Sequence, residues 1–142
     1  MKNFREKLAV VTGGGTGMGR ELTTQLAAEG CHVAICDVSV DNMAETQQMA
    51  AASAPAGTRI TAHLCDVSDE RAVREMLASI KNSFERLDVL VNNAGTTAAW
   101  KPKDLESLSL EEWDKVFAVN VRGLFQVTRA AVPLLKESRG CV

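Results

Sequence analysis

A run of glycines near the amino terminus restricts the fold more than any other feature of this chain. Five of the seven residues from Gly13 to Gly19 are glycine. The run follows the β-rich apolar segment Leu8–Thr12 and leads into a helical pattern over residues 17–29, in which apolar residues recur every four positions. A glycine turn between a strand and a helix lets backbone N–H groups hold a phosphate group. The run therefore predicts an anion-binding loop carried by a β-α unit.

Short apolar runs alternate with helical patterns along the rest of the chain. Three more strands are predicted, over residues 32–37, 59–66 and 87–92. The nearly continuous apolar character of the first and fourth runs is typical of strands covered on both faces. The alternation indicates an α/β fold with a doubly wound parallel sheet. Gly140-Cys-Val142 resembles the start of a fifth strand, so we expect this chain to be the front part of a longer one.

Capping residues mark two of the predicted helices. The first covers residues 69–84, and Ser68 is expected to be its N-cap. The second begins with Ser109-Leu-Glu-Glu112, which has the spacing of a capping box, and runs towards Leu135 with a kink or break near Pro133. Residues 50–57 are expected to form a loop.

Composition excludes several classes of protein. The 142 residues are 46% apolar and 24% charged with a net charge of −2, which fits one globular domain and gives no electrostatic basis for binding nucleic acid. No apolar run is long enough for a membrane span or an export signal, so we expect a cytoplasmic protein with reduced thiols. The four cysteines form no C-x-x-C pair and there are two histidines, which argues against a metal site. There is no tyrosine.

The spacing of the glycines distinguishes between the classes of ligand that the loop could bind. A P-loop is excluded because Arg20 and Glu21 stand where lysine and serine or threonine are needed. The pattern G-x-G-x-x-G fails at Arg20 as well. The G-x-G-x-G pattern of S-adenosylmethionine enzymes fits, although Val11 replaces the usual acid. The pattern T-G-x-x-x-G-x-G, starting at Thr12, fits at every position.

With this loop and three further motifs, the sequence resembles the short-chain dehydrogenase/reductase family. The further motifs are Asp66-Val67, Asn92-Asn-Ala-Gly95 and Asn120. The resemblance covers essentially the whole chain. It implies a Rossmann-like dinucleotide-binding domain over residues 1–142, truncated at the start of the fifth strand. It also implies hydride transfer between a nicotinamide cofactor and a secondary alcohol or ketone.

The resemblance assigns roles position by position. The residues expected to contact the cofactor are Gly13, Gly15, Thr16, Gly17, Met18, Gly19, Asp37, Val38, Asp66, Val67, Asn93, Ala94 and Gly95. Asn120 matches the catalytic-site asparagine, which holds a water that leads to the family's lysine. Asn92 is expected to be structural, its amide holding neighbouring strands together.

Asp37 predicts a preference for NAD over NADP. A carboxylate at the end of the second strand can accept both ribose hydroxyls of the adenosine. It would repel a 2′-phosphate by about 4 kcal/mol before screening, at ~4 Å and an effective dielectric near 20. The next residues, Val38-Ser-Val40, include no base that would offset this repulsion.

The catalytic serine, tyrosine and lysine of the family have no counterpart here. We therefore expect the isolated chain to be inactive, and the parent protein to be an NAD-dependent oxidoreductase of a small alcohol or carbonyl substrate. Trp100 could stack on that substrate, and the helix over residues 109–135 is expected to form a homo-oligomer interface. Two alternatives stay open: a non-catalytic nucleotide-binding or assembly module and, more distantly, an S-adenosylmethionine-dependent methyltransferase.

Overall fold

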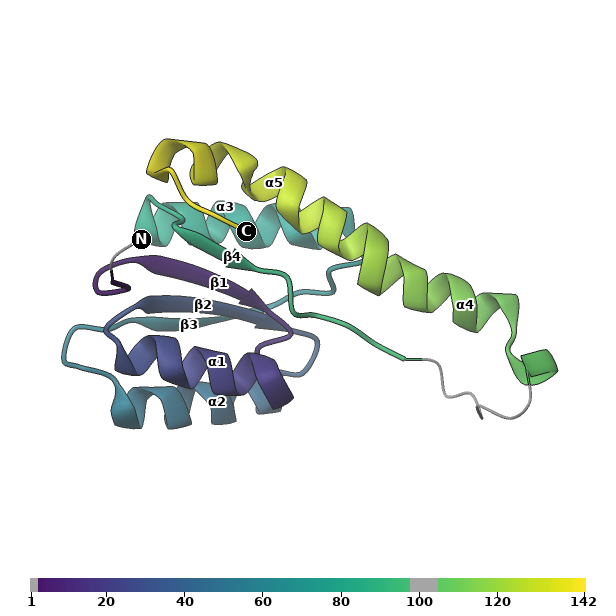
Figure 1. Ribbon diagram of the computed structural model, residues 1–142, viewed down its shortest axis with the longest axis horizontal. Coiled ribbons are helices and arrows are strands. Elements are labelled where there is room, and N and C mark those ends of the chain that lie inside the picture. Colours follow the sequence, from purple (N-terminus) through teal and green to yellow (C-terminus); the bar gives the residue numbers. More distant parts are fainter. Residues whose placement is uncertain (1–2, 98–104) are drawn as a thin grey trace.

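The computed structural model describes residues 3–97 and 105–142, which form a four-stranded parallel sheet flanked by helices (Figure 1). The strands are β1 (Leu8–Thr12), β2 (His32–Asp37), β3 (Ile60–Leu64) and β4 (Val89–Val91). The helices are α1 (Gly17–Ala28), α2 (Val40–Ser53), α3 (Glu70–Phe84), α4 (Leu110–Phe117) and α5 (Leu124–Ser138). A 3-10 turn, η1 (Leu105–Ser107), precedes α4, and a π-helical segment, η2 (Ala118–Gly123), joins α4 to α5.

The sheet confirms the predicted doubly wound fold. Its strand order is β3-β2-β1-β4, so the chain moves outward from β1 to β3 and then crosses to the other side of β1. Helices α1 and α2 cover one face, and α3 and α5 cover the other (Figure 1). In open parallel sheets, ligands bind where the strand order reverses, at the carboxyl ends of the strands. Here that point lies between β1 and β4, directly beside the glycine run.

Alternation along the two central strands supplies both halves of the core. Leu8 and Val10 of β1 face α3 and α5, whereas Ala9 and Val11 face α1 and α2. Every residue of β1 is buried. This double burial explains why the strand is a continuous apolar run and has no polar face.

Asp88 links the amino ends of β1 and β4. Its side chain is 2% exposed, and Oδ2 accepts hydrogen bonds from Leu8 N at 2.9 Å and Arg86 Nε at 2.7 Å. Burial raises the pKa of this carboxyl, but the bonds from Arg86 and Leu8 and the charge of Lys7 outweigh it, so the pKa lies below its usual value. The carboxylate is therefore a stabilising part of the sheet.

Two predicted helix boundaries are wrong. The N-cap of α3 is Asp69, whose Oδ1 accepts from Arg71 N at 2.8 Å, and Ser68 instead donates to Asp66. Residues 50–53, expected in a loop, form the last turn of α2. Alanine has the highest helix propensity, and Ala50 is fully buried in the core, so that turn is stabilised by both effects.

The irregularity in the last predicted helix also lies elsewhere. The chain is regular through Pro133, and α5 continues to Ser138. Pro133 and Arg129, whose carbonyl loses its helical partner, are both exposed, so water can replace the missing hydrogen bond. The helical geometry changes instead at η2, which contains Asn120. The capping box at Ser109 is confirmed by the bond from Glu112 N to Ser109 Oγ at 3.1 Å.

Candidate cofactor site

The glycine run forms a tight turn between β1 and α1. Gly13 has a φ of +65°, and a Cβ on it would lie 2.8 Å from Ala94 Cα. A Cβ on Gly19 would overlap the carbonyl oxygen of Gly13. Any side chain at these two positions would push the loop away from β4 or from the start of α1. The bare backbone leaves room for a ligand to approach closely.

The first turn of α1 has free backbone donors. Its N-cap, Thr16, is extended and makes no capping hydrogen bond with its side chain. Thr16, Gly17 and Met18 are all exposed. Uncapped N–H groups at a helix start attract anions, because they lack partners and lie at the positive end of the helix dipole. The cradle therefore fits the pyrophosphate of a dinucleotide.

A cavity of about 280 Å³ opens beside this turn at the carboxyl ends of the strands. Seven of the predicted cofactor residues line it: Gly13, Asp37, Val38, Asp66, Val67, Ala94 and Gly95. These residues follow four different strands, so only the sheet brings them together. The other predicted contacts, Gly15, Thr16, Gly17, Met18, Gly19 and Asn93, belong to the adjoining glycine turn or to the end of β4 and do not line the cavity.

Asp37 is held in place by the backbone around it. Its Oδ2 accepts from Gly15 N at 3.0 Å and its Oδ1 accepts from Ser39 N at 3.1 Å. A Cβ on Gly15 would lie 2.8 Å from Asp37 Oδ2, so this contact requires glycine. Each carboxylate oxygen has a second acceptor position, which leaves the group able to accept two hydroxyls.

Asp66 is also part of a local turn. Its Oδ1 accepts from Ser68 N at 2.8 Å and from Ser68 Oγ at 2.7 Å, while the side chain stays exposed at the cavity. The turn fixes the carboxylate just after β3. Val67 behind it is buried and packs into the core.

Asn92 and Asn93 have different partners from those expected. Asn92 Nδ2 donates to Thr128 Oγ1 of α5 at 2.9 Å, so it does not join strands, and the prediction for this residue is wrong. Asn93 joins them instead: its Nδ2 lies 3.0 Å from the carbonyl oxygens of both Thr12 and Gly13. Both residues follow the end of β4 at Val91, and of the two only Asn93 has its amide beside the end of β1.

Thr12 completes this junction and was missed as a site residue. Its Oγ1 accepts from Asn93 N and Ala94 N, each at 3.0 Å, and lies 3.3 Å from Val91 O. One hydroxyl thus shapes the turn after β4. The signal in the sequence was its place directly before the glycines.

Asn120 reaches back to the loop that follows β4. Its Nδ2 donates to Thr96 O at 2.9 Å and its Oδ1 accepts from Thr96 N at 2.8 Å. Thr96 lines the cavity, as does Lys115 of α4. Neither was predicted, and Lys115 carries no local signal because only the direction of α4 brings it there. Trp100 lies outside the described residues.

Two thiols lie under the cavity. Cys36 and Cys65 both line it and are buried. The hydrogen bond between the two thiols, together with burial, raises the pKa of Cys36 well above its usual value. The same hydrogen bond lowers the pKa of Cys65.

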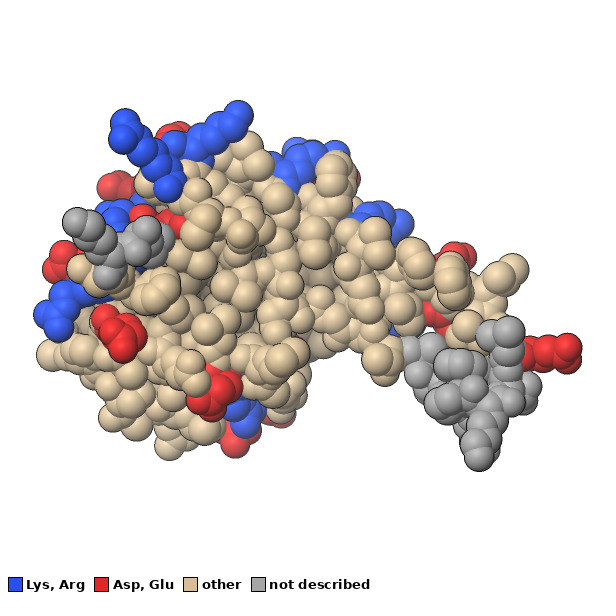
Figure 2. Space-filling view, in the orientation of Figure 1, with Lys and Arg blue, Asp and Glu red and all other residues tan. Residues whose placement is uncertain are grey.

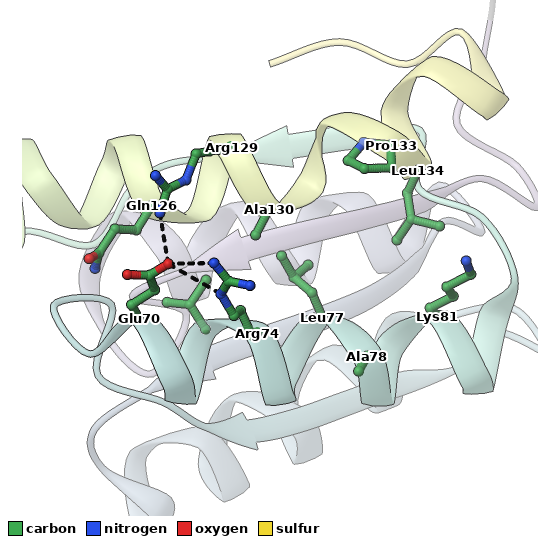
Figure 3. Close-up of a pocket in the computed structure, with 11 residues that line it drawn as sticks. Glu70, Arg74, Leu77, Ala78, Lys81, Gln126, Arg129, Ala130, Pro133 and Leu134 are labelled. Carbon is green, nitrogen blue, oxygen red and sulfur yellow. Dashed lines mark hydrogen bonds and ion pairs between the residues drawn. The ribbon is translucent and has the colours of Figure 1, made fainter.

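A larger cavity, about 520 Å³, lies between α3 and α5, away from the glycine turn (Figure 3). On its rim, Glu70 Oε1 accepts from Arg74 Nη2 at 2.6 Å and from Arg129 Nη2 at 2.8 Å. None of the predicted cofactor residues lines it. The charged side chains of Glu70, Arg74 and Arg129 are paired with one another at an exposed surface.

Over residues 3–97 and 105–142 there is no group of three or more histidine, cysteine, aspartate or glutamate side chains that could hold a metal ion. Within the same residues, no helix has the length and apolar character required to cross a membrane.

The fold is Rossmann-like, and comparison with known proteins defines the family. The family described as short chain dehydrogenase matches residues 7–142. The (3R)-3-hydroxyacyl-CoA dehydrogenase of Canis lupus familiaris is 40% identical over 144 residues, covering 97% of this chain and 54% of the relative. The chain belongs to the short-chain dehydrogenase family.

Solved structures agree with this assignment. An NAD+-bound xylitol dehydrogenase has a TM-score of 0.88 at 27% identity, covering 98% of this chain and 52% of the other. A metagenomic short-chain oxidoreductase in complex with NADP has a TM-score of 0.86 at 28% identity, covering 96% of this chain and 60% of the other. The chain spans about half the length of the curated relatives it matches.

Proposed function

We propose that this chain is the cofactor-binding part of a nicotinamide-dependent oxidoreductase that interconverts a secondary alcohol and a ketone. The observation that carries the proposal is the single cavity where the residues after four parallel strands meet beside an uncapped helix. The bound nicotinamide would supply hydride transfer.

Gly13, Gly15 and Gly17 let the backbone approach the pyrophosphate, which the uncapped N–H groups at the start of α1 bind, with Thr16 and Met18 at its edge. Gly19 keeps α1 close to β1. At one end of the cavity, Asp37 and Val38 face the adenosine ribose, and Asp66 and Val67 face the adenine. At the other end, Asn93, Ala94 and Gly95 face the ribose on the nicotinamide side.

The preferred cofactor is NAD. Asp37 is fixed by Gly15 N and Ser39 N, so it cannot move away from a 2′-phosphate without losing both bonds. Arg20, the basic residue beside the loop, is paired with Glu45 at 2.8 Å and is not free to neutralise a phosphate. Solved relatives bind NAD in one case and NADP in another, so Asp37 carries this proposal.

Asn120 has a positioning role in the parent enzyme. Its Oδ1 accepts from Thr96 N and its Nδ2 donates to Thr96 O, so the side chain links η2 to the rim of the cavity. The second amide hydrogen and the second lone pair of Oδ1 can hold a water. A chain of these 142 residues contains no tyrosine to act as acid or base. We expect it to bind the cofactor without measurable turnover.

The proposed substrate class and oligomeric state follow from the resemblance to the family. Similar proteins are named as dehydrogenases or reductases of hydroxyacyl-CoA, levodione and butanediol, which supports a small alcohol or carbonyl substrate. Apolar side chains exposed along α4, η2 and the start of α5 support a homo-oligomer through residues 109–135: Leu110, Trp113, Phe117, Val121, Leu124 and Phe125. Buried free thiols support a reducing compartment such as the cytoplasm.

Calorimetric titration of the purified protein with NAD, NADP and S-adenosylmethionine tests the function. We expect NAD to bind at least about tenfold more tightly than NADP, since repulsion by Asp37 persists in part at physiological salt. Asp37→Asn should reduce the ratio between the dissociation constants for NADP and NAD. Equal affinity for NAD and NADP would remove the preference, and binding of S-adenosylmethionine alone would favour the methyltransferase alternative.

A further inference from the structure

Arg20 makes contacts that the cofactor role of the glycine loop does not explain. It lies in the first turns of α1, one residue beyond the last glycine of the run, and its side chain is 19% exposed. The guanidinium does not point into solvent or toward the cavity. It folds back over the loop and reaches α2.

The guanidinium bonds to a single loop carbonyl. Arg20 Nε and Nη2 donate to Gly15 O at 3.0 and 2.6 Å. Nε also lies 3.0 Å from Thr46 Oγ1, whose hydroxyl is in turn 3.1 Å from Gly15 O. Thr46 is fully buried. The carbonyl of Gly15 is thus enclosed by three polar atoms from two helices.

Glu45 of α2 holds the guanidinium in this position. Its Oε2 accepts from Arg20 Nη2 at 2.8 Å, and the carbonyl of Asn42 lies 3.4 Å from the same nitrogen. Arginine suits this place because its planar fork can serve several acceptors in fixed directions, which a lysine ammonium on a flexible stem does less well.

The same residue is held from its other side by Asp37. The N–H of Gly15 donates to Asp37 Oδ2 at 3.0 Å, while its carbonyl accepts from Arg20. Rotating either peptide plane beside Gly15 would break a charge-assisted hydrogen bond. Glycine has no side chain to restrict its backbone, so these bonds supply the restriction that the residue itself lacks.

Resting on the proposed function, we infer that Arg20 is a positioning residue. With Thr46 and Glu45 it fixes the loop at Gly15, and through that loop it sets both the phosphate cradle and the Asp37 carboxylate. Arg20 itself does not touch the cofactor. Its effect is to order the loop before binding, so that less conformational entropy is lost when the dinucleotide arrives.

The test compares Arg20→Met with Arg74→Met. Arg74 is a matched control, because it also pairs with a glutamate (Glu70, at 2.6 Å) but lies on α3, far from the loop in sequence and fold. Two readouts are taken on each protein: the dissociation constant for NAD by calorimetry, and hydrogen exchange of the backbone amides from Thr12 to Arg20 without cofactor.

We expect Arg20→Met to weaken NAD binding by about tenfold or more, the equivalent of one lost charge-assisted hydrogen bond, and to speed exchange in the loop. Arg74→Met should change neither. Arg20→Lys should recover part of the affinity. Glu45→Gln, which leaves Arg20 and Gly15 in place, should give the same changes on a smaller scale and covers the case in which Arg20→Met does not fold.

The outcomes separate this inference from the function. If wild-type protein binds NAD and Arg20→Met binds it equally well, the inference is wrong and the function stands. If wild-type protein binds no nicotinamide dinucleotide, the proposed function fails and the cofactor part of the inference fails with it. Unchanged loop exchange in both Arg20→Met and Glu45→Gln overturns the positioning role in either case.

Discussion

The carboxyl edge of the sheet and the helical arm that follows it differ in how many of their side chains have partners within the described chain. We use helical arm for residues 110–125, which comprise α4, η2 and the start of α5. At the sheet edge, polar groups such as those of Thr12 and Asp37 have defined partners within the chain. Along the arm, apolar side chains are exposed, from Leu110 at 82% to Phe125 at 57%. Figure 2 shows the arm projecting from the main body with few charges on the face in view.

This difference separates two kinds of sequence constraint. A residue at the sheet edge is limited by atoms already present in the fold, so even one added methyl group is felt there. A residue on the arm is exposed in the described chain, and its apolar side chain is one that the proposed homo-oligomer interface would bury. The stacked rings of Trp113 and Phe117, with centroids 4.7 Å apart, lie on that exposed side.

The largest expected effect comes from adding a methyl group where the loop meets the helix. Gly19→Ala would place a Cβ against the carbonyl oxygen of Gly13, and we expect it to destabilise the fold by about 3 kcal/mol. Urea unfolding followed by circular dichroism measures this. Gly57→Ala is the control, since Gly57 has a positive φ but no neighbour within 4 Å, and should lose only about 1 kcal/mol. Equal losses would mean that crowding at the sheet edge is not the constraint.

A smaller effect is expected at the opposite edge of the sheet. Asp88→Asn removes the buried charge that pairs with Arg86 and Lys7, and should lower stability by about 2 kcal/mol at neutral pH, because these partners are themselves partly exposed. The folded-state pKa of Asp88 lies below its unfolded value, so this stability is present above the unfolded pKa.

The stabilisation by the Asp88 carboxylate should be lost as the pH falls through the folded-state pKa of Asp88. The difference in unfolding free energy between wild type and Asp88→Asn should therefore shrink as the pH is lowered from neutral through the unfolded pKa of aspartate, about 4. A constant difference across this range would contradict the assignment.

We expect the neighbouring residues Asn93 and Asn92 to contribute unequally to the stability of the fold. Asn93→Ala removes two hydrogen bonds to the end of β1, and we expect a loss of about 1–2 kcal/mol. Asn92→Ala removes one bond to Thr128 but also a buried oxygen that has no partner in the described chain, so its loss should be smaller. Thermal unfolding of both variants ranks them. The reverse order would restore Asn92 as the residue that joins the strands.

The smallest change in stability is expected on the arm. Leu124→Gln, at a side chain that is 47% exposed, should change the unfolding free energy by less than about 0.5 kcal/mol. It should nevertheless weaken self-association, measured by sedimentation velocity across a concentration series. Met49→Gln, at a position 45% exposed on α2, is the matched control and should leave association unchanged. Similar self-association of both variants would show that the helical arm is not an interface.

Much of the fold could be predicted from the sequence because its signals are local. The strand limits at Leu8–Thr12 and His32–Asp37 match the predicted runs, since residues buried on both faces must be apolar throughout. The helix boundary at Ser68 and the break at Pro133 were placed wrongly. At the first, the Asp69 carboxylate caps the helix in place of Ser68, and at the second, the exposure of Arg129 and Pro133 leaves the carbonyl without a helical partner open to water.

The sequence by itself determined which backbone must stay bare and which residues end each strand, because glycine spacing and apolar runs act over a few residues. Only the tertiary structure decided that Asn93 joins β1 to β4, that Lys115 reaches the cavity and that Arg20 closes on Gly15. These contacts join segments up to 81 residues apart. Their partners are selected by the side on which each side chain leaves its strand or helix, which depends on how the packed elements are oriented.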